Sequence, residues 1–158
     1  MKLSFLQQLQ RLTGLATGRI LLAGSGPERV ASEQLMEYLL AELPDLLMAA
    51  VVEISTGDAW ATYSSERDYR TTAVVGYNAE VIRQIQALLR AQRQADEALD
   101  EILITLPSQV HLLRLLPDQK NFVYLAVDSH DTNLAIAREV LRSGLELLQP
   151  VAPAVVVS

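Results

Sequence analysis

The sequence predicts an α+β domain in which a five-stranded antiparallel sheet carries helices on both faces. Three long segments repeat apolar residues at the spacing of an amphipathic helix, and five short apolar runs bounded by turn-forming residues lie between them. Their order is helix, strand, strand, helix, strand, strand, strand, helix, after a helical N-terminal extension. Strands joined by short polar turns pair antiparallel, so we expect all five in one sheet.

Length and composition limit the class of protein. The 158 residues suffice for one domain, and 50% of them are hydrophobic against 20% charged, which is enough for a packed core. A formal net charge of −6 argues against a nucleic-acid partner, because such proteins gather Lys and Arg against phosphates. The absence of cysteine excludes disulfides and thiolate chemistry and is typical of a reducing cytoplasm, where we expect the protein. No apolar run is long enough to form a transmembrane segment.

The first 26 residues predict an extension and a hinge. Leu3, Leu6 and Leu9 fall on one side of a helix that lacks the lysines expected for membrane binding, which favours docking on a protein. The glycines that punctuate the stretch RILLAGSGPER indicate a hinge, and its AGSGPER part lacks the Lys and Ser/Thr of a phosphate-binding loop. We therefore expect an extension over 1–26, one domain over 27–149 and an apolar tail over 150–158.

The elements of the domain follow from its apolar pattern. Residues 27–43 have helical spacing, with Pro27 suited to the first turn. LLMAAVVEI is continuously apolar, as in a strand covered on both faces, and STGD joins it to the strand AWATYSS in a hairpin. EILITLP, VHLLRLLP and NFVYLAVD form a three-stranded meander, and a last helix begins near Thr132 and ends near Leu148.

The longest helix is expected between about Asp68 and Arg93. Its apolar stripe is wider than the arc of about 100° that a helix needs to lie on a sheet. The extra width indicates a second contact, most simply the same helix in another copy of the protein. The residues predicted for this dimer or partner surface are Tyr77, Val81, Arg83, Gln84, Ile85 and Leu88.

The segment DSHDTNLAIA, residues 128–137, gathers acids, a hydroxyl and a histidine, as a hydrolase or metal site would. Adjacent side chains point in different directions, however, and the other histidine, His111, lies among leucines in a strand. The start of a helix requires only one such residue, because Ser129 or Asp131 at the N-cap would accept a hydrogen bond from a free backbone N–H of the first turn. We therefore expect one of these two residues as a structural cap, and no catalytic residue, metal or cofactor.

Two stretches resemble a known family. AVVEISTGDAWATYSS is similar to the first hairpin of Roadblock / dynein light chain domains, in which an apolar strand ends in an acid before a Gly-containing turn. VHLLRLLPDQKNFVYLAVDSHDTNLAIAREVLRSGLELL resembles their closing half, and the resemblance as a whole covers about residues 28–148. The residues that carry the likeness at the start of the last helix are Asn133, Leu134, Ala135, Ala137 and Arg138.

The resemblance implies a platform rather than an enzyme. Such domains are homodimers whose sheets join edge to edge and whose central helices pack side by side, presenting a surface to a small Ras-like GTPase or a larger assembly. Bacterial members of the GTPase-regulator type can position groups that the GTPase already has, so the platform needs no catalytic side chain. Two other classes stay open: a small acidic chaperone of the secretion type, and a GAF- or profilin-like sensor of a small ligand.

Overall fold

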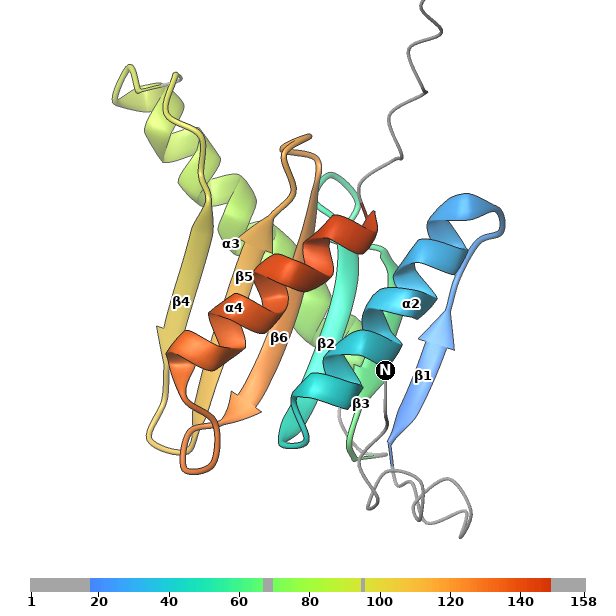
Figure 1. Ribbon diagram of the computed structural model, residues 1–158. Coiled ribbons are helices and arrows are strands. Elements are labelled where there is room, and N and C mark those ends of the chain that lie inside the picture. The colour runs from blue at the N-terminus through green and yellow to red at the C-terminus, as the bar shows by residue number, and fades with distance from the viewer. Residues whose placement is uncertain (1–17, 67–69, 95, 149–158) are drawn as a thin grey trace, which may run out of the picture.

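The computed structural model describes residues 18–66, 70–94 and 96–148, which form one antiparallel sheet with helices on both faces (Figure 1). In chain order the elements are β1 (Arg19–Leu22), α2 (Pro27–Glu42), β2 (Leu46–Glu53), β3 (Ala59–Ser64), α3 (Thr71–Ala91), β4 (Glu101–Thr105), β5 (Gln109–Leu115), β6 (Asn121–Asp128), α4 (Leu134–Leu145) and the short 3-10 helix η1 (Glu146–Leu148). The predicted α+β class is confirmed, and the order from α2 to α4 is the predicted one.

Within the described residues the sheet has six strands, in the order β1-β3-β2-β6-β5-β4, so the prediction of five is wrong. The additional strand, β1, lies in the stretch predicted as a hinge and pairs antiparallel with β3 over all four of its residues. A turn does exist there, but it follows the strand. Gly24 and Gly26 have φ of 73° and 86°, a backbone region that glycine enters without the clash that a Cβ causes.

Strands β2 and β6 occupy the middle of the sheet, and turns place the other strands beside them. The turn between β2 and β3 contains Gly57 at φ 76°, as its glycine predicts. In the turn between β5 and β6, the carboxylate of Asp118 accepts hydrogen bonds from the backbone N–H of Lys120 (2.8 Å) and Asn121 (3.0 Å). These local bonds fix the turn between the last two strands of the meander β4, β5 and β6 that the turn residues predict.

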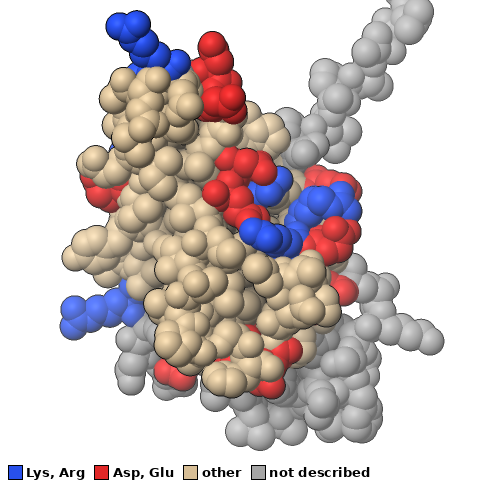
Figure 2. Space-filling view, turned by 90° about the vertical axis from the view of Figure 1, so that its left-hand side faces the viewer, with Lys and Arg blue, Asp and Glu red and all other residues tan. Residues whose placement is uncertain are grey.

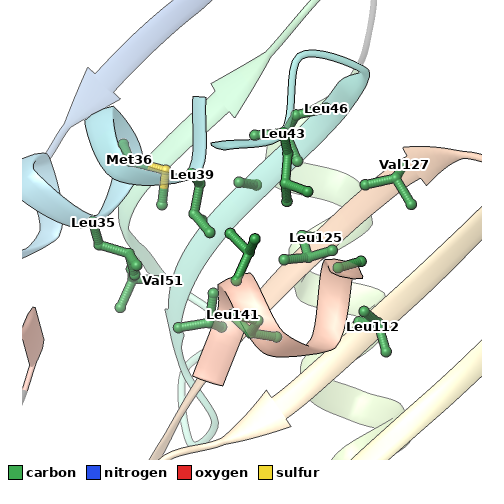
Figure 3. Close-up of a cluster of buried hydrophobic side chains, with 14 of the residues drawn as sticks. Leu35, Met36, Leu39, Leu43, Leu46, Val51, Leu112, Leu125, Val127 and Leu141 are labelled. Atoms are coloured by element: carbon green, nitrogen blue, oxygen red, sulfur yellow. The ribbon is translucent and has the colours of Figure 1, made fainter. Parts of the chain in front are cut away.

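One hydrophobic core fills the space between the sheet and the helices α2 and α4 (Figure 3). Leu35, Met36 and Leu39 of α2 are fully buried and face β2, β6 and Leu141 of α4. Helix α2 also approaches α4 closely at Gly144, where a Cβ would lie 2.7 Å from the Cδ1 atom of Leu35. The two helices thus form one layer on this face.

A second core lies on the opposite face of the sheet, beneath α3. Val75, Ala79 and Ile82 of α3 are fully buried against side chains of the central strands, including Phe122 and Tyr124. Figure 1 shows α3 crossing behind the sheet and continuing beyond β4. Both faces of β2 and β6 are therefore covered, as their continuously apolar sequences predict.

The helix predicted for the start of the chain and the apolar tail over 150–158 lie outside the described residues, and only the end of the predicted extension, from residue 18, is described. In the ranges that are described, no helix is both long and apolar enough to cross a bilayer.

Two helical glycines allow a matched test of the packing. Gly76 in α3 has open space where a Cβ would stand, whereas at Gly144 a Cβ would meet buried Leu35 and also Tyr38 at 3.1 Å. We expect Gly76→Ala to stabilise the fold by about 0.5–1 kcal/mol through helix propensity. Gly144→Ala should destabilise it by about 1 kcal/mol, because overpacking of about 1–3 kcal/mol outweighs the same gain. Urea titrations of the two variants measure this difference, and equal stabilisation by both would contradict the close approach of α2 and α4.

Candidate protein-interaction face

Helix α3 exposes apolar side chains along one side. Its sheet-facing side is buried, but Tyr77, Val81 and Leu88 are 76%, 39% and 52% exposed. At 3.6 residues per turn these three side chains lie together, next to the arc that faces the sheet. The apolar stripe of α3 is therefore wider than the part of the helix that the sheet covers.

Five of the six predicted surface residues share this side of α3. Besides the three exposed apolar residues, these are Gln84, which is exposed, and Ile85, which is half-buried next to the sheet-facing arc. The Nε2 atom of Gln84 donates to Oε1 of Glu80 at 2.7 Å, and this bond, together with Arg83, holds the pKa of the Glu80 carboxyl below its usual value. Their role as a dimer or partner surface stays a prediction.

The sixth predicted residue, Arg83, lies on the other side of α3. Its Nη1 atom donates to the backbone oxygen of Ile54, and its Nε and Nη2 atoms donate to Oε2 of Glu80 at 3.1 and 2.6 Å. Arg83 therefore ties α3 to the end of β2. It does not share the exposed apolar side with the other five residues.

Strand β4 forms one edge of the sheet, and no described strand pairs with its outer side. The backbone N–H of Leu106 donates to the carbonyl of Gln109 (2.8 Å), and the N–H of Leu115 donates to the carbonyl of Asp100 (3.0 Å). The backbone N–H and C=O groups of the even-numbered residues of this stretch therefore point toward β5. Because successive residues of a strand point their backbone groups to alternate sides, Glu101, Leu103 and Thr105 direct theirs outward. The outer edge thus offers hydrogen-bonding groups to a further strand.

The surface on this side of the molecule is mostly uncharged. Figure 2 looks onto the β4 side and shows a broad uncharged area, with a cluster of acidic and basic side chains to its right and further charged groups at its top, left and lower margins. Leu103 and Leu106 are among the exposed large hydrophobic residues here. Open edges are usually protected by charges or by proline because they invite pairing with another chain. The β4 edge, which is uncharged from Ile102 to Thr105, and the exposed apolar side of α3 together define the candidate interaction face.

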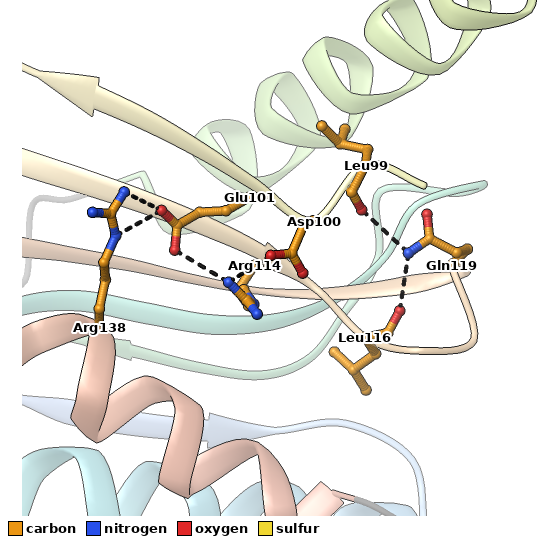
Figure 4. Close-up of polar contacts among 7 residues, drawn as sticks. All are labelled: Leu99, Asp100, Glu101, Arg114, Leu116, Gln119 and Arg138. Atoms are coloured by element: carbon orange, nitrogen blue, oxygen red, sulfur yellow. Dashed lines mark hydrogen bonds and ion pairs between the residues drawn. The ribbon is translucent and has the colours of Figure 1, made fainter. Parts of the chain in front are cut away.

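A network of ion pairs connects β4 with β5 and α4 (Figure 4). The carboxylate of Glu101, whose side chain is only 14% exposed, accepts from Nε and Nη2 of Arg138 and lies 3.6 Å from Nη1 of Arg114. Arg114 also pairs with Asp100 at 2.9 Å. These residues line an open groove of about 680 Å³ in which each arginine has an acidic partner. The network stabilises the start of β4, and no arginine that lines this groove is left unpaired to bind an anion.

The acid-rich segment that follows β6 forms a turn and a helix start. The carboxylate of Asp128 accepts from the backbone N–H of His130 (2.8 Å) and contacts its ring, which together hold the pKa of Asp128 below its usual value. The hydroxyl of Ser129 donates to the carbonyl of Pro107. Within the described residues, no group of three or more His, Cys, Asp or Glu side chains could hold a metal ion.

The predicted caps of the last helix, Ser129 and Asp131, are wrong. Helix α4 begins at Leu134, and the side chain of Asn133 accepts from the backbone N–H of Ala135 at 2.8 Å. The turn closed by the N–H of Thr132 bonding to Asp128 moves the helix start past both predicted residues. The segment is therefore a helix start, as expected, with a different N-cap.

His111 and Tyr124 form a polar pair under the α3 face. Nδ1 of His111 lies 2.8 Å from the hydroxyl of Tyr124, and the rings are 5.9 Å apart. The Nε2 atom of His111 is buried without a hydrogen-bond partner among the described residues. Burial lowers the pKa of this histidine, because a charged imidazolium loses its hydration there.

Comparisons with known proteins identify the fold. Gliding protein MglB from Thermus thermophilus matches with a TM-score of 0.66 and 17% identity, over 81% of this chain and 92% of that one. The fold is of the Roadblock type. An MglB structure with a tetrameric arrangement gives a TM-score of 0.66 at 17% identity, over 81% of this chain and 91% of that one. The Roadblock/LC7 domain from Streptomyces avermitilis gives 0.53 at 13% identity, over 71% of this chain and 89% of that one.

No protein-family model and no curated protein matches the sequence. At 13–17% identity, the likeness to these structures is one of Roadblock fold and not of individual site residues.

The pair of His111 and Tyr124 predicts how stability depends on pH. The pKa of His111 is lower in the folded protein than its usual 6.5, so the unfolded chain takes up this proton first. The contribution of neutral His111 is therefore complete above pH 6.5 and decreases as the pH falls towards the folded pKa. We expect urea midpoints to fall between pH 7 and about 5, and His111→Gln to reduce that fall. An equal fall in the variant would contradict this role.

Proposed function

We propose that the protein is a non-enzymatic regulator or adaptor that self-associates through the candidate interaction face and serves a small Ras-like GTPase or a larger assembly. The observation that carries the proposal is the combination of an open β4 edge, uncharged from Ile102 to Thr105, with an exposed apolar side of α3 on a Roadblock-type fold. A second copy related by a two-fold axis would cover both features at once, because in such an interface a surface of one copy contacts the same surface of the other.

The physical chemistry of both features favours this occupant. Pairing of β4 with another β4 satisfies the outward backbone groups of the edge, as in recognition by strand addition. Burial of the exposed apolar side chains of α3 adds about 25 cal/mol per Å² of apolar surface that leaves water. The ion-pair network that begins at Glu101 lies at one end of β4 and needs no rearrangement for this pairing.

The GTPase link is supported by the family resemblance of the sequence and by the Roadblock-type fold. It asks for no reacting side chain, since a regulator of this kind can orient groups of the GTPase itself. The proposal therefore assigns no catalytic residue to the chain. The cytoplasmic location expected from the absence of cysteine stays a prediction.

No specific observation favours the alternative classes. A hollow lined by Trp60, Asn121 and Leu148 has a volume of about 160 Å³, smaller than the roughly 300–1,000 Å³ of common ligand sites. The larger groove beside α4 is open and lined mainly by paired charges. Neither of these two hollows has the size and apolar lining that a sensor of a small apolar ligand needs. The secretion-type chaperone is distinguished by the experiments below.

Substitution on α3 tests self-association. We expect the wild-type protein to be a dimer by light scattering, and Leu88→Glu to shift it to a monomer, because two like charges would be desolvated at the two-fold seam. Its thermal unfolding should remain cooperative, since Leu88 is 52% exposed in the single chain. Ile136→Glu is the matched control: Ile136 is 55% exposed on α4, on the opposite face of the sheet. A wild-type monomer, or equal loss of the dimer in both variants, would contradict the proposed surface.

The same variants test the partner. Recovery of wild-type protein from a native extract, followed by mass spectrometry, should retain a folded small GTPase, and Leu88→Glu should lose it while Ile136→Glu keeps it. The hydrolysis rate of that GTPase with and without the protein then separates a regulator from a scaffold. Recovery of a single secreted protein would instead support the chaperone alternative, and failure to retain any GTPase would contradict the proposed partner.

A further inference from the structure

The sheet has a second outer edge at β1, and no described strand pairs with the outer side of this strand. We infer that residues 154–158 of the chain's own apolar tail add to this edge as an antiparallel strand. The inference goes beyond the proposed self-association, which uses the opposite edge of the sheet at β4, and does not depend on it. It follows from the backbone directions of β1, the position of Leu148 and the sequence of the tail.

The outer side of β1 presents backbone groups to a further strand. The N–H of Ala23, the residue after β1, donates to the carbonyl of Trp60 in β3 at 2.8 Å, so the backbone groups of Ala23 point toward β3. Because successive residues of a strand direct these groups to alternate sides, Leu21 also faces β3, whereas Ile20 and Leu22 direct theirs outward. An extended segment on this side would therefore bind the N–H and C=O groups of Ile20 and Leu22.

Strand β1 carries apolar side chains on both of its faces. Ile20 and Leu22 are half-buried against the core beneath α2, whereas Leu21 lies on the opposite face and is 51% exposed. A strand that alternates apolar and polar residues would match only one of these faces. The three consecutive valines at 155–157 instead place apolar side chains on both faces, since successive side chains of a strand point to opposite sides. Valine is also among the residues most enriched in strands.

The tail begins close to the end of β1. Leu148, the residue before the tail, packs against the core beneath α2 and lines the small hollow beside Trp60. Trp60 is also the residue whose carbonyl binds the N–H of Ala23, directly after β1. One residue of β3 thus lies next to both Leu148 and the Ala23 end of β1. A tail that starts here meets β1 at its last residue and runs along it in the opposite direction, so the pairing is antiparallel.

The prolines of the tail determine which of its residues pair. Proline has no backbone N–H for a strand ladder, so the inferred strand begins after Pro153. Extended backbone advances about 3.3 Å per residue, so residues 149–153 span about 16 Å, more than the two strand spacings of about 10 Å between β3 and the outer side of β1. The five residues after Pro153 span about the same length, which covers the four residues of β1.

Pairing within one molecule removes two hazards at once. An open strand edge and an uncharged run of β-branched residues each invite pairing with other chains. In the inferred arrangement each covers the other. The β1 edge is then closed, and the β4 edge of the candidate interaction face stays open.

Proline substitutions in the tail of the full chain test the inference, with hydrogen exchange of the Ile20 and Leu22 amides by NMR as the readout. The double variant Val155→Pro/Val156→Pro removes the N–H groups of two successive residues. One of the two faces β1 whichever register the tail adopts, because strand residues alternate in direction. Val151→Pro is the matched control, since it adds a proline to the segment before the inferred strand. The buried amides of β6 report in all three proteins that the fold is intact.

We expect slow exchange of both β1 amides in the wild-type chain at every protein concentration, loss of this protection in the double variant and its retention in Val151→Pro. Fast exchange in the wild-type chain, or equal loss in both variants, would overturn the inferred strand. Protection that survives in the double variant would assign the edge to another segment, and protection that disappears on dilution would assign it to another copy of the chain. Either result would overturn the inference and leave the proposed self-association through β4 and α3 to its own tests.

Discussion

The structure depends on the pairing of β2 with β6 in the middle of the sheet, where both strands are buried on both faces. Every residue of β6 from Phe122 to Val127 is buried, as are Ala49, Ala50 and Val52 of β2. Each fully buried large apolar side chain contributes about 1.5–3 kcal/mol, so these strands require a helix layer on either side. Helices α2 and α4 supply one layer and α3 supplies the other. The edges of the sheet are then the places where backbone groups remain open to another chain.

This arrangement pairs the charged groups near β4 and α4 and leaves apolar surface uncovered. The acidic and basic side chains that could be mistaken for a reaction site satisfy each other: Asp128 binds the N–H of His130, and Glu101 binds Arg138. The exposed side of α3 and the edge of β4, which the single chain leaves uncovered, are largely apolar. A surface of this kind is stabilised when another protein covers it, because apolar side chains then leave water.

Much of the fold could be predicted from the sequence because its signals are local. The continuous apolar run of β2, the Gly-containing turn before β3 and the heptad spacing of α3 each identify their element without knowledge of the rest. Strand β1 could not be predicted in this way. Four residues between glycines carry no periodicity, and their strand conformation depends on the free edge of β3, which only the folded sheet provides.

The candidate site shows the same division between local and distant information. The apolar side of α3 was predictable from helical spacing, but the bond of Arg83 to the carbonyl of Ile54, 29 residues away in sequence, was not. The contact of Glu101 with Arg138 spans 37 residues, and no local pattern indicates it. Asn133 replaced the predicted caps because Asp131, Thr132 and Asn133 all favour that position, and only the preceding turn decides among them.

The central claim is that another copy of the chain covers the β4 edge, and backbone hydrogen exchange tests it most directly. The outward N–H groups of Glu101, Leu103 and Thr105 have no partner strand among the described residues of the single chain. The account predicts slow exchange of these three amides at high protein concentration and fast exchange on dilution, while the buried amides of β6 stay protected at both. Fast exchange of all three at a concentration where light scattering shows a dimer would contradict the claim.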